Sequence, residues 1–330
     1  MFGLSKSIFR FSTIFAFTVA SMVVMPVQAE DNYPSQTIKL NVGFPAGQMT
    51  DLLTRVVADH LGKKLNETVI VQNKPGQGGS MALAQLARSK ADGYEIMLSP
   101  TAALVITPHL YSAVPYDSTK DFEFIGKVAE VPFVLVARSD MPFDDVAGFL
   151  ENAKQNPNSI TFTSPGNGTL PHLGMTLFQK TTNTSLIHIP YKGSPRAIMD
   201  MAAGRVDVGF DTQVVTRPFI EQGQIKLLAV TSEERVDTLP DTPTIREAGI
   251  DNFRLVAWFG LVAPKGTPES VINKLSHALK DISENPKYQD QVKSTGAMAS
   301  WLSKDDFTDL FNAEYTQWKT IVKESGAQID

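Results

Sequence analysis

Residues 38–51 read IKLNVGFPAGQMTD, and this segment indicates the fold class of the chain. Its first seven residues alternate apolar and other side chains as a β-strand does, and Pro45-Ala46-Gly47 then interrupts the alternation. Thr50 and Asp51 open a stretch in which apolar residues return at helical spacing as far as Leu65. The segment therefore predicts a strand, a loop and a helix in succession.

The same unit recurs along the chain. Strands that alternate with helices predict parallel-rich sheets covered by helices. Two series, which begin at Ile38 and Phe133, favour two α/β lobes over one. The further strand patterns lie at 69–73, 95–98, 133–137, 160–163, 186–189, 206–210, 226–230 and 258–264, and the further helix patterns near 81–88, 144–155, 172–181, 195–203, 268–283 and 304–324.

Large aromatic residues fall into two sets. The set in the last helix has helical spacing, which predicts packing in the core or between lobes rather than a cofactor site. The other set follows or lies within strands and could line a cleft, although buried packing is the ordinary role of such residues. The first set is Phe307, Phe311, Tyr315 and Trp318, and the second is Phe44, Phe210, Trp258 and Phe259.

The first 29 residues have the features of a signal peptide. Lys6 and Arg10 precede an apolar run from Phe11 to Met25, and Val27-Gln28-Ala29 is a small-x-small cleavage pattern. The run is shorter than the roughly 20 residues that span a bilayer, so we expect cleavage and export, with an uncleaved anchor as the alternative. Loss of these two cations changes the net charge from -5 to -7.

Composition excludes several classes of function. An acidic chain does not favour nucleic acid as a partner. The absence of cysteine excludes disulfides, thiol nucleophiles and thiolate metal sites. The five histidines show no metal-binding spacing, so we expect neither a metal nor another cofactor. An anionic ligand would have to be held by local dipoles and a few placed donors.

Three loops have the position of a ligand site. Ligands of open parallel sheets bind beyond the carboxyl ends of strands, where unpaired N–H groups and the helix dipole favour anions. The loops are 44–51, 98–102 and 163–172. In the first, Asp51 either contacts a ligand or serves as the i,i+4 partner of Arg55.

The loop from Ser164 to Thr169 is rich in glycine, as an anion cradle is. It is not a dinucleotide fingerprint, because Pro171 stands where the third glycine would be. His172 either caps the following helix or contacts the ligand. Ser164, His172 and Asp211 could be imagined as a hydrolase triad, but there is no G-x-S-x-G elbow, so we expect no enzyme.

The ordered motifs of the whole chain after the leader resemble one family, the Bug-type receptors of tripartite tricarboxylate transporters. The matching motifs are Tyr33-Pro34, Phe44-Pro45-Ala46-Gly47 with Asp51 and Arg55, Asn73 to Gly79, Asp92-Gly93-Tyr94, Pro115-Tyr116-Asp117, Asp121-Phe122, His172-Leu173, Pro190-Tyr191-Lys192-Gly193, Gly204, Ala229 to Ser232, Pro240 to Thr244, Glu247-Ala248-Gly249 and Ala263 to Pro268.

The resemblance implies the two-lobed Venus-flytrap fold of class II type periplasmic binding proteins. Lobe one would comprise residues 30–131 plus 252–330, and lobe two residues 132–251. The return of the C-terminal segment to lobe one follows from the resemblance, since strand counting does not reveal it.

The family's ligands are mostly carboxylates, and the resemblance implies which residues surround them. One carboxylate would lie at Pro45, Ala46, Gly47, Met49 and Thr50, and the other end of the ligand at Ser164, Gly166, Gly168, Thr169 and His172. Thr101 and Asp211 follow strands and are further lining residues. Gln48 stands where the family usually has a second glycine, and its side chain could narrow the cleft or donate a hydrogen bond.

The expected function is that of a monomeric periplasmic receptor that delivers a small carboxylate to the membrane permease subunits of a tripartite tricarboxylate transporter. The alternatives are a binding protein for sulfonates or another class of anion, and a ligand sensor for a two-component system. A periplasmic esterase or amidase is the remaining alternative from a different class.

Overall fold

The computed structural model describes residues 1–3, 33–251 and 253–328. Contacts within the chain separate two units, Met1–Tyr33 and Pro34–Asp330, and the fold below is that of the second. The expected signal peptide, 1–29, lies outside the described residues except for its first three. In the described ranges, no helix has the length and apolarity that crossing a bilayer requires.

The first group of strands is built around β1 (Ile38–Val42). β1 pairs in parallel with β2 (Val69–Asn73) on one side and with β3 (Glu95–Pro100) on the other. β9 (Val256–Pro264) comes from much later in the chain and runs antiparallel to β3. The prediction for residues 38–51 is confirmed, because α1 (Met49–Leu65) follows β1 after a short loop.

The second group of strands is built around β5 (Thr161–Ser164). β5 pairs in parallel with β6 (Ile187–Pro190) and with β7 (Val208–Thr212). β7 and β8 (Ile225–Val230) both run antiparallel to β4 (Phe122–Arg138). The parallel-rich strand pattern predicted from residue 160 onward is therefore present.

β4 takes part in both groups. Its residues Phe122–Pro132 pair with β9, and its residues Phe133–Arg138 pair with β7 and β8. β10 (Met298–Leu302) pairs with the first half. The predicted strand at 133–137 is thus only the second half of a 17-residue strand.

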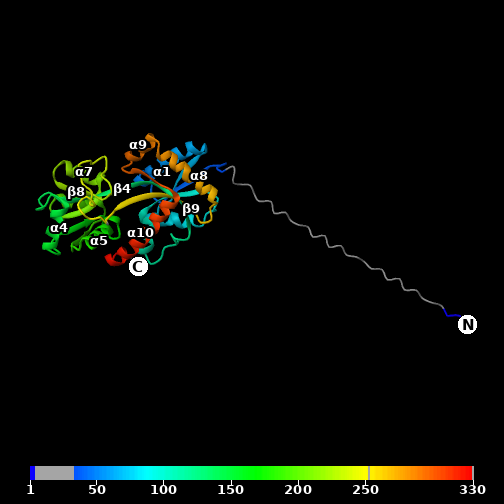
Figure 1. The fold of residues 1–330 in the computed structure, drawn as a ribbon, viewed down its shortest axis with the longest axis horizontal. Coiled ribbons are helices and arrows are strands. Elements are labelled where there is room, and N and C mark those ends of the chain that lie inside the picture. The colour runs from blue at the N-terminus through cyan, green and yellow to red at the C-terminus, as the bar shows by residue number, and fades with distance from the viewer. Residues whose placement is uncertain (4–32, 252, 329–330) are drawn as a thin grey trace. The chain divides into compact units, whose positions relative to one another are not determined.

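The strands have the order β2-β1-β3-β9-β4-β7-β5-β6, with β8 and β10 paired to β4 off this path. Figure 1 shows the labels α4, α5, α7 and β8 on one side of β4 and α1, α8 and α9 on the other. Helices therefore cover both strand groups, as the alternating sequence pattern predicts.

The remaining helices fit the predicted ranges with small shifts, except for three additions. A 3-10 turn at Gln77–Gly79 leads into α2, and a π-helical segment at Ala102–Ile106 leads into α3. The additions are α3, α7 and α9. The helices are α2 (Ser80–Leu86), α3 (Thr107–Leu110), α4 (Val146–Gln155), α5 (Leu170–Thr182), α6 (Ser194–Ala202), α7 (Gln213–Glu221), α8 (Glu269–Ser283), α9 (Pro286–Ser294) and α10 (Lys304–Ser325).

The aromatic residues of α10 pack into the core, as predicted. Phe307, Phe311 and Trp318 are buried. The Phe307 ring lies against Gly260 of β9, where an added Cβ would come within 2.1 Å of it. Phe210, Trp258 and Phe259 are buried as well, so these three have the ordinary packing role.

Candidate functional site

The carboxyl ends of strands from both groups meet the same short segment of β4, residues 129–134. Pro100 ends β3 opposite Phe259 of β9, which in turn lies opposite Ala129 of β4. Thr212 ends β7 opposite Phe133, and the end of β8 lies opposite Val134. The loops that follow β3, β7 and β8 therefore face one region. The loops that follow β1, β5 and β6 face it too, because β1 runs parallel to β3, β5 runs parallel to β7, and β6 runs parallel to β5.

The helices that follow β1, β5, β6 and β7 begin without a side-chain cap. Side chains do cap α4, α9 and α10, through Asp145, Asn285 and Ser303. α2, α3 and α8 also lack a side-chain cap. Uncapped N–H groups at a helix start are free to bind an anion. The four starts that follow β1, β5, β6 and β7 are, with their N-cap residues, α1 at Gln48, α5 at Thr169, α6 at Gly193 and α7 at Thr212.

The β1–α1 loop is exposed from Pro45 to Gln48, with Met49 partly exposed. Gly47 has φ 84°, in the left-handed region that favours glycine. An added Cβ there would meet no atom within 4 Å. The side chain of Gln48 is exposed and makes no capping hydrogen bond. This loop therefore offers open backbone in front of α1.

Asp51 holds this loop in place. Its Oδ2 accepts hydrogen bonds from the N–H of Gly47 (2.9 Å) and from Nε of Arg55 (3.0 Å), and its Oδ1 accepts from Nδ2 of Asn73 (2.8 Å). Burial acts to raise the pKa of Asp51, but these hydrogen bonds outweigh it and lower the pKa. Both carboxylate oxygens are thus engaged within the protein, which favours the i,i+4 role over ligand contact.

Thr50, Thr101 and Asp211 are also buried. Thr101 Oγ1 donates to the carbonyl of Trp258 (2.9 Å) and accepts from its N–H (2.6 Å), so the hydroxyl joins β3 to β9. Asp211 Oδ1 accepts from the N–H of Thr212 (2.7 Å), and burial raises the pKa of Asp211. The side chains of Thr101 and Asp211 therefore stabilise the strand ends.

The β5–α5 loop is held by hydrogen bonds between its own residues. Ser164 Oγ lies 3.2 Å from both the N–H and the carbonyl oxygen of Gly166. Thr169 Oγ1 donates to the same carbonyl (2.7 Å), and the N–H of Gly168 donates to Nδ1 of His172 (3.1 Å). The five residues assigned to the lobe-two end of the site are thereby brought together across the end of β5, the loop and the first turn of α5.

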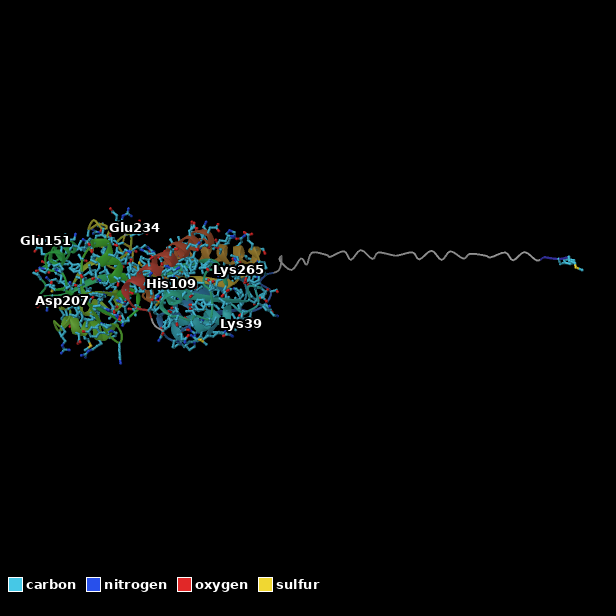
Figure 2. All side chains as sticks on the ribbon, turned by 90° about the horizontal axis from the view of Figure 1, so that it is seen from below. Lys39, His109, Glu151, Asp207, Glu234 and Lys265 are labelled. Atoms are coloured by element: carbon cyan, nitrogen blue, oxygen red, sulfur yellow. The ribbon has the colours of Figure 1, made fainter. Side chains whose placement is uncertain are left out.

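The loop packs against α3. An added Cβ on Gly168 would lie 2.7 Å from Leu110 of α3. Nε2 of the neighbouring His109 lies 3.0 Å from the carbonyl oxygen of Tyr315 in α10. Figure 2 shows His109 between one set of labelled residues, Lys39 and Lys265, and another set, Glu151, Asp207 and Glu234. The β5–α5 loop thus lies where the two strand groups meet.

His188 was not among the expected site residues. Pairing of β5 with β6 places it beside Phe162, on which its ring stacks at 4.6 Å. Its Nε2 lies 2.7 Å from Ser164 Oγ, and its ring stacks on His172 at 4.0 Å. The sequence pattern placed His188 within a predicted strand only. Its contact with Ser164 depends on the register between β5 and β6, which the pattern does not reveal.

The imagined hydrolase triad does not form. Ser164 pairs with His188 instead of His172, and its side chain is fully buried. Asp211 binds the neighbouring backbone, as described above. A nucleophile must be reached by its substrate, and a Ser–His pair needs a third group to orient the base. In the part of the chain that the structure describes, no group of three or more His, Asp and Glu could hold a metal ion.

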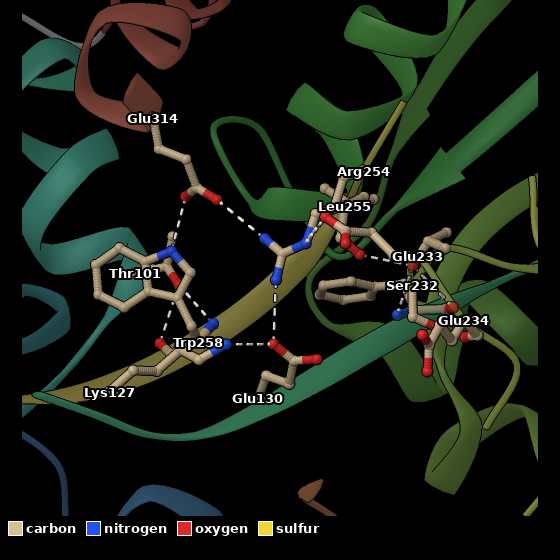
Figure 3. A network of polar contacts seen from close by, with 12 residues as sticks. Thr101, Lys127, Glu130, Ser232, Glu233, Glu234, Arg254, Leu255, Trp258 and Glu314 are labelled. Atoms are coloured by element: carbon tan, nitrogen blue, oxygen red, sulfur yellow. Dashed lines mark hydrogen bonds and ion pairs between the residues drawn. The ribbon is translucent and has the colours of Figure 1, made fainter. Parts of the chain in front are cut away.

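A polar network at the crossing between the strand groups was not foreseen (Figure 3). Arg254 lies just before β9 and pairs with Glu130 of β4 (3.0 Å), Glu314 of α10 (3.2 Å) and Glu233 (3.5 Å). Glu130 also binds the buried Lys127 (2.8 Å). Burial raises the pKa of Glu314 in spite of hydrogen bonds from two tryptophans. One guanidinium therefore ties together three parts of the chain.

Comparison with known proteins gives the site a context. The model of a family described as tripartite tricarboxylate transporter family receptor matches residues 53–327. The structure of periplasmic binding protein BugD is 35% identical, with a TM-score of 0.67, covering 90% of this chain and 99% of that one.

Two structures from Rhodopseudomonas palustris contain small diacids. Rpa4515 with adipate is 29% identical, with a TM-score of 0.70, covering 89% of this chain and 98% of that one. MatC with bound malate is 26% identical, with a TM-score of 0.66, covering 88% and 100%. These similarities extend over both strand groups.

Proposed function

The chain belongs to the tripartite tricarboxylate transporter receptor family, and from this we propose that it is a periplasmic solute-binding receptor for a small organic carboxylate. Its fold is the two-lobed α/β fold of periplasmic binding proteins. The receptor would hand its ligand to the membrane permease subunits of a tripartite transporter. It acts by binding and not by catalysis in this proposal.

We assign residues 30–131 plus 252–330 to lobe one and residues 132–251 to lobe two. Strand pairing supports this division, because β1, β2, β3, β9 and β10 pair with one another or with the first half of β4. β5 to β8 pair with one another or with its second half. The ligand cleft then lies beside residues 129–134 of β4.

One observation carries the proposal of an anionic ligand: the starts of α1, α5, α6 and α7, which follow strand ends of this region, have no side-chain cap. Side chains cap α4, α9 and α10, none of which follows these strand ends, whereas α2, α3 and α8 are uncapped as well. Free N–H groups at the positive end of a helix dipole bind carboxylates without lysine or arginine. This arrangement suits a receptor whose surface is acidic overall.

The ligand we propose is a dicarboxylate, since two relatives bind adipate and malate. One carboxylate would bind at Pro45, Ala46, Gly47, Met49 and Thr50, with the exposed amide of Gln48 as an added donor. The other would bind at the loop of Ser164, Gly166, Gly168, Thr169 and His172. Asp51, Thr101 and Asp211 would support the two loops from behind through the hydrogen bonds described above.

The ligand would act as a bridge between the lobes. A ligand that contacts both lobes binds the closed form more tightly and shifts the open–closed equilibrium. Moving that equilibrium from 1:99 to 99:1 takes about 5.5 kcal/mol of differential affinity, which two carboxylate contacts can supply. Scattering profiles with and without the ligand should therefore differ, and identical profiles would contradict closure.

A thermal-shift screen tests the receptor proposal. The purified protein would be heated with mono-, di- and tricarboxylates, aromatic acids, amino acids and sulfonates. A true ligand at 100 times its Kd should stabilise the folded state by about 2.7 kcal/mol. Stabilisation by dicarboxylates supports the proposal, whereas stabilisation by sulfonates alone would contradict the assigned ligand class.

A further inference from the structure

The cleft beside β4 contains a cavity of about 440 Å³. Residues 131–134 of β4 line it, and strand pairing places the ligand cleft at this same segment. Thr212, the N-cap residue of α7, follows Asp211 and lines the cavity as well. Small-molecule sites usually have volumes of roughly 300–1,000 Å³. The cavity is therefore part of the proposed carboxylate site, and its walls help to decide which carboxylate fits.

Apolar side chains from both strand groups form much of the cavity wall. Val134 lies in the second half of β4, Val214 in α7, and Met298 in β10, which pairs with the first half of β4. Val214 and Met298 are 67% and 37% exposed, so water covers much of both side chains. An added Cβ on Gly296, just before β10, would lie 3.2 Å from Val214, so the two sides nearly meet there. An apolar ligand body in the cavity would cover both exposed side chains, which is favourable.

The charged groups of the lining balance one another. Among the described residues that line the cavity, Lys293 and Arg217 are the cations and Asp237 is the carboxylate. Arg217 is paired with Glu221 (2.7 Å), which leaves one charge of each sign, on Lys293 and Asp237. The lining therefore has no net charge that would select a further charged group on the ligand.

Two polar side chains of the lining bond to each other. Thr238 Oγ1 donates a hydrogen bond to Oε1 of Gln213 (2.7 Å). A hydroxyl group on the ligand body would give up its hydrogen bonds to water when it lies against apolar side chains, and an unpaired polar group is costly. The cavity therefore favours a hydrocarbon body over one that carries hydroxyl groups.

We propose that the ligand is a dicarboxylate whose carboxylates are joined by a hydrocarbon body longer than that of malate and free of hydroxyl groups, and that this body lies in the cavity. The inference rests on the proposed receptor function and adds the substrate class to it. The carboxylates bind at the loops assigned above, and the body lies against Val134, Val214 and Met298. Because Val214 and Met298 come from different strand groups, a body that covers both favours the closed form.

Calorimetric titration with succinate, adipate and suberate tests the length of the body. Each further methylene that is fully buried should tighten binding about fourfold. Adipate should therefore bind more tightly than succinate, and suberate, which has the longest chain, about tenfold or more tightly than succinate. Malate, which differs from succinate by one hydroxyl group, should bind no more tightly than succinate.

Val214→Ser tests whether the body lies in the cavity. The side chain is 67% exposed, so the change should not disturb folding. It should weaken suberate about fivefold and change succinate little, because only the longer body reaches this wall. The matched control is Met199→Ser, which removes a side chain that is 51% exposed from α6, outside the cavity. It should leave the affinities for both acids unchanged.

The inference is overturned if succinate or malate binds as tightly as suberate, or if Val214→Ser binds suberate as the wild type does. The receptor proposal stands in either case, because a carboxylate is still bound. If none of these acids binds the wild type, the dicarboxylate receptor proposal itself is contradicted, and this inference with it.

Discussion

His172 and His188 stack with their ring centroids 4.0 Å apart and their planes 6° apart. His172 accepts a hydrogen bond from the N–H of Gly168, and His188 lies within hydrogen-bond distance of Ser164. Burial lowers the pKa of both, and the neighbouring His172 adds to the effect at His188, whose pKa falls to about 4. Two neutral imidazoles thus support the β5–α5 loop.

We expect the protein to lose stability as the pH falls from 6.5 towards 4. The unfolded chain binds a proton on His188 near the ordinary pKa of 6.5, whereas the folded chain does so only near its lowered pKa of about 4. Protons therefore favour unfolding across this window, by up to about 3 kcal/mol for this one group. Urea denaturation at pH 7, 6 and 5 measures the free energy of unfolding.

His188→Phe separates this effect from that of the carboxyl groups. Phenylalanine keeps a flat ring against Phe162 and His172 but cannot bind a proton. The variant should therefore lose less stability than the wild type between pH 7 and pH 5. If the wild type and His188→Phe lost the same free energy of unfolding between pH 7 and pH 5, the acid sensitivity would belong to groups other than His188.

Ser164→Ala should weaken ligand binding without affecting any ester hydrolysis. The hydroxyl lies between His188 and the backbone of Gly166, so its loss loosens the loop that we assign to the ligand. Loss of one such hydrogen bond costs about 1 kcal/mol, or about fivefold in Kd. Calorimetry with the ligand from the screen measures the affinity, and an activated ester measures turnover.

Ser159→Ala is the control for this change, because its hydroxyl donates to the carbonyl of Asn156 at an exposed place before β5. It should bind the ligand as the wild type does. An ester turnover that the wild type shows and Ser164→Ala lacks would instead support the hydrolase alternative.

Much of the fold could be predicted from the sequence because its strands and helices have regular apolar patterns. The apolar pattern did not predict the elements in which charged residues, a proline or a largely polar composition interrupt it. Glu123, Lys127 and Glu130 interrupt the first half of β4, so only the apolar half was recognised. α7 contains Pro218, and α9 is largely polar, so neither shows a long apolar repeat.

The site was predictable where its contacts are local in sequence. The four-residue spacing of Asp51 and Arg55 predicted a pair that the structure contains at 3.0 Å. The partners of His188 and Arg254 lie far away in the chain and depend on strand register and on the return of β9. No local sequence pattern contains the strand register or the return of β9, so the contacts of His188 and Arg254 were not predicted.

Arg254→Ala should destabilise the protein by about 3 kcal/mol. Its removal leaves Glu314, whose side chain is 13% exposed, without its ion-pair partner, and burial of an unpaired charge is costly. Glu233→Gln is the control, because Glu233 is 68% exposed and its pairing with Arg254 is the longest of the three. It should cost about 0.5 kcal/mol or less. Equal losses of unfolding free energy in the two variants would contradict the role given to Arg254.

Gly47 and Gly266 are a matched pair for testing the proposed carboxylate loop. Both are exposed, with φ of 84° and 86°, and an added Cβ meets no atom within 4 Å at either position. Gly47→Ala and Gly266→Ala should therefore destabilise the fold alike, by about 1 kcal/mol, because each forces an L residue into the left-handed region.

Only Gly47→Ala should weaken the ligand, because its methyl group stands where a carboxylate must approach the N–H groups of α1. Thermal unfolding measures the shared loss of stability, and calorimetry with the ligand from the screen measures the difference in Kd. If both variants bound the ligand as tightly as the wild type, Pro45 to Thr50 would not form the binding loop. The uncapped starts of α5, α6 and α7 would then have to hold the ligand without help from lobe one, and such a ligand would not bridge the lobes.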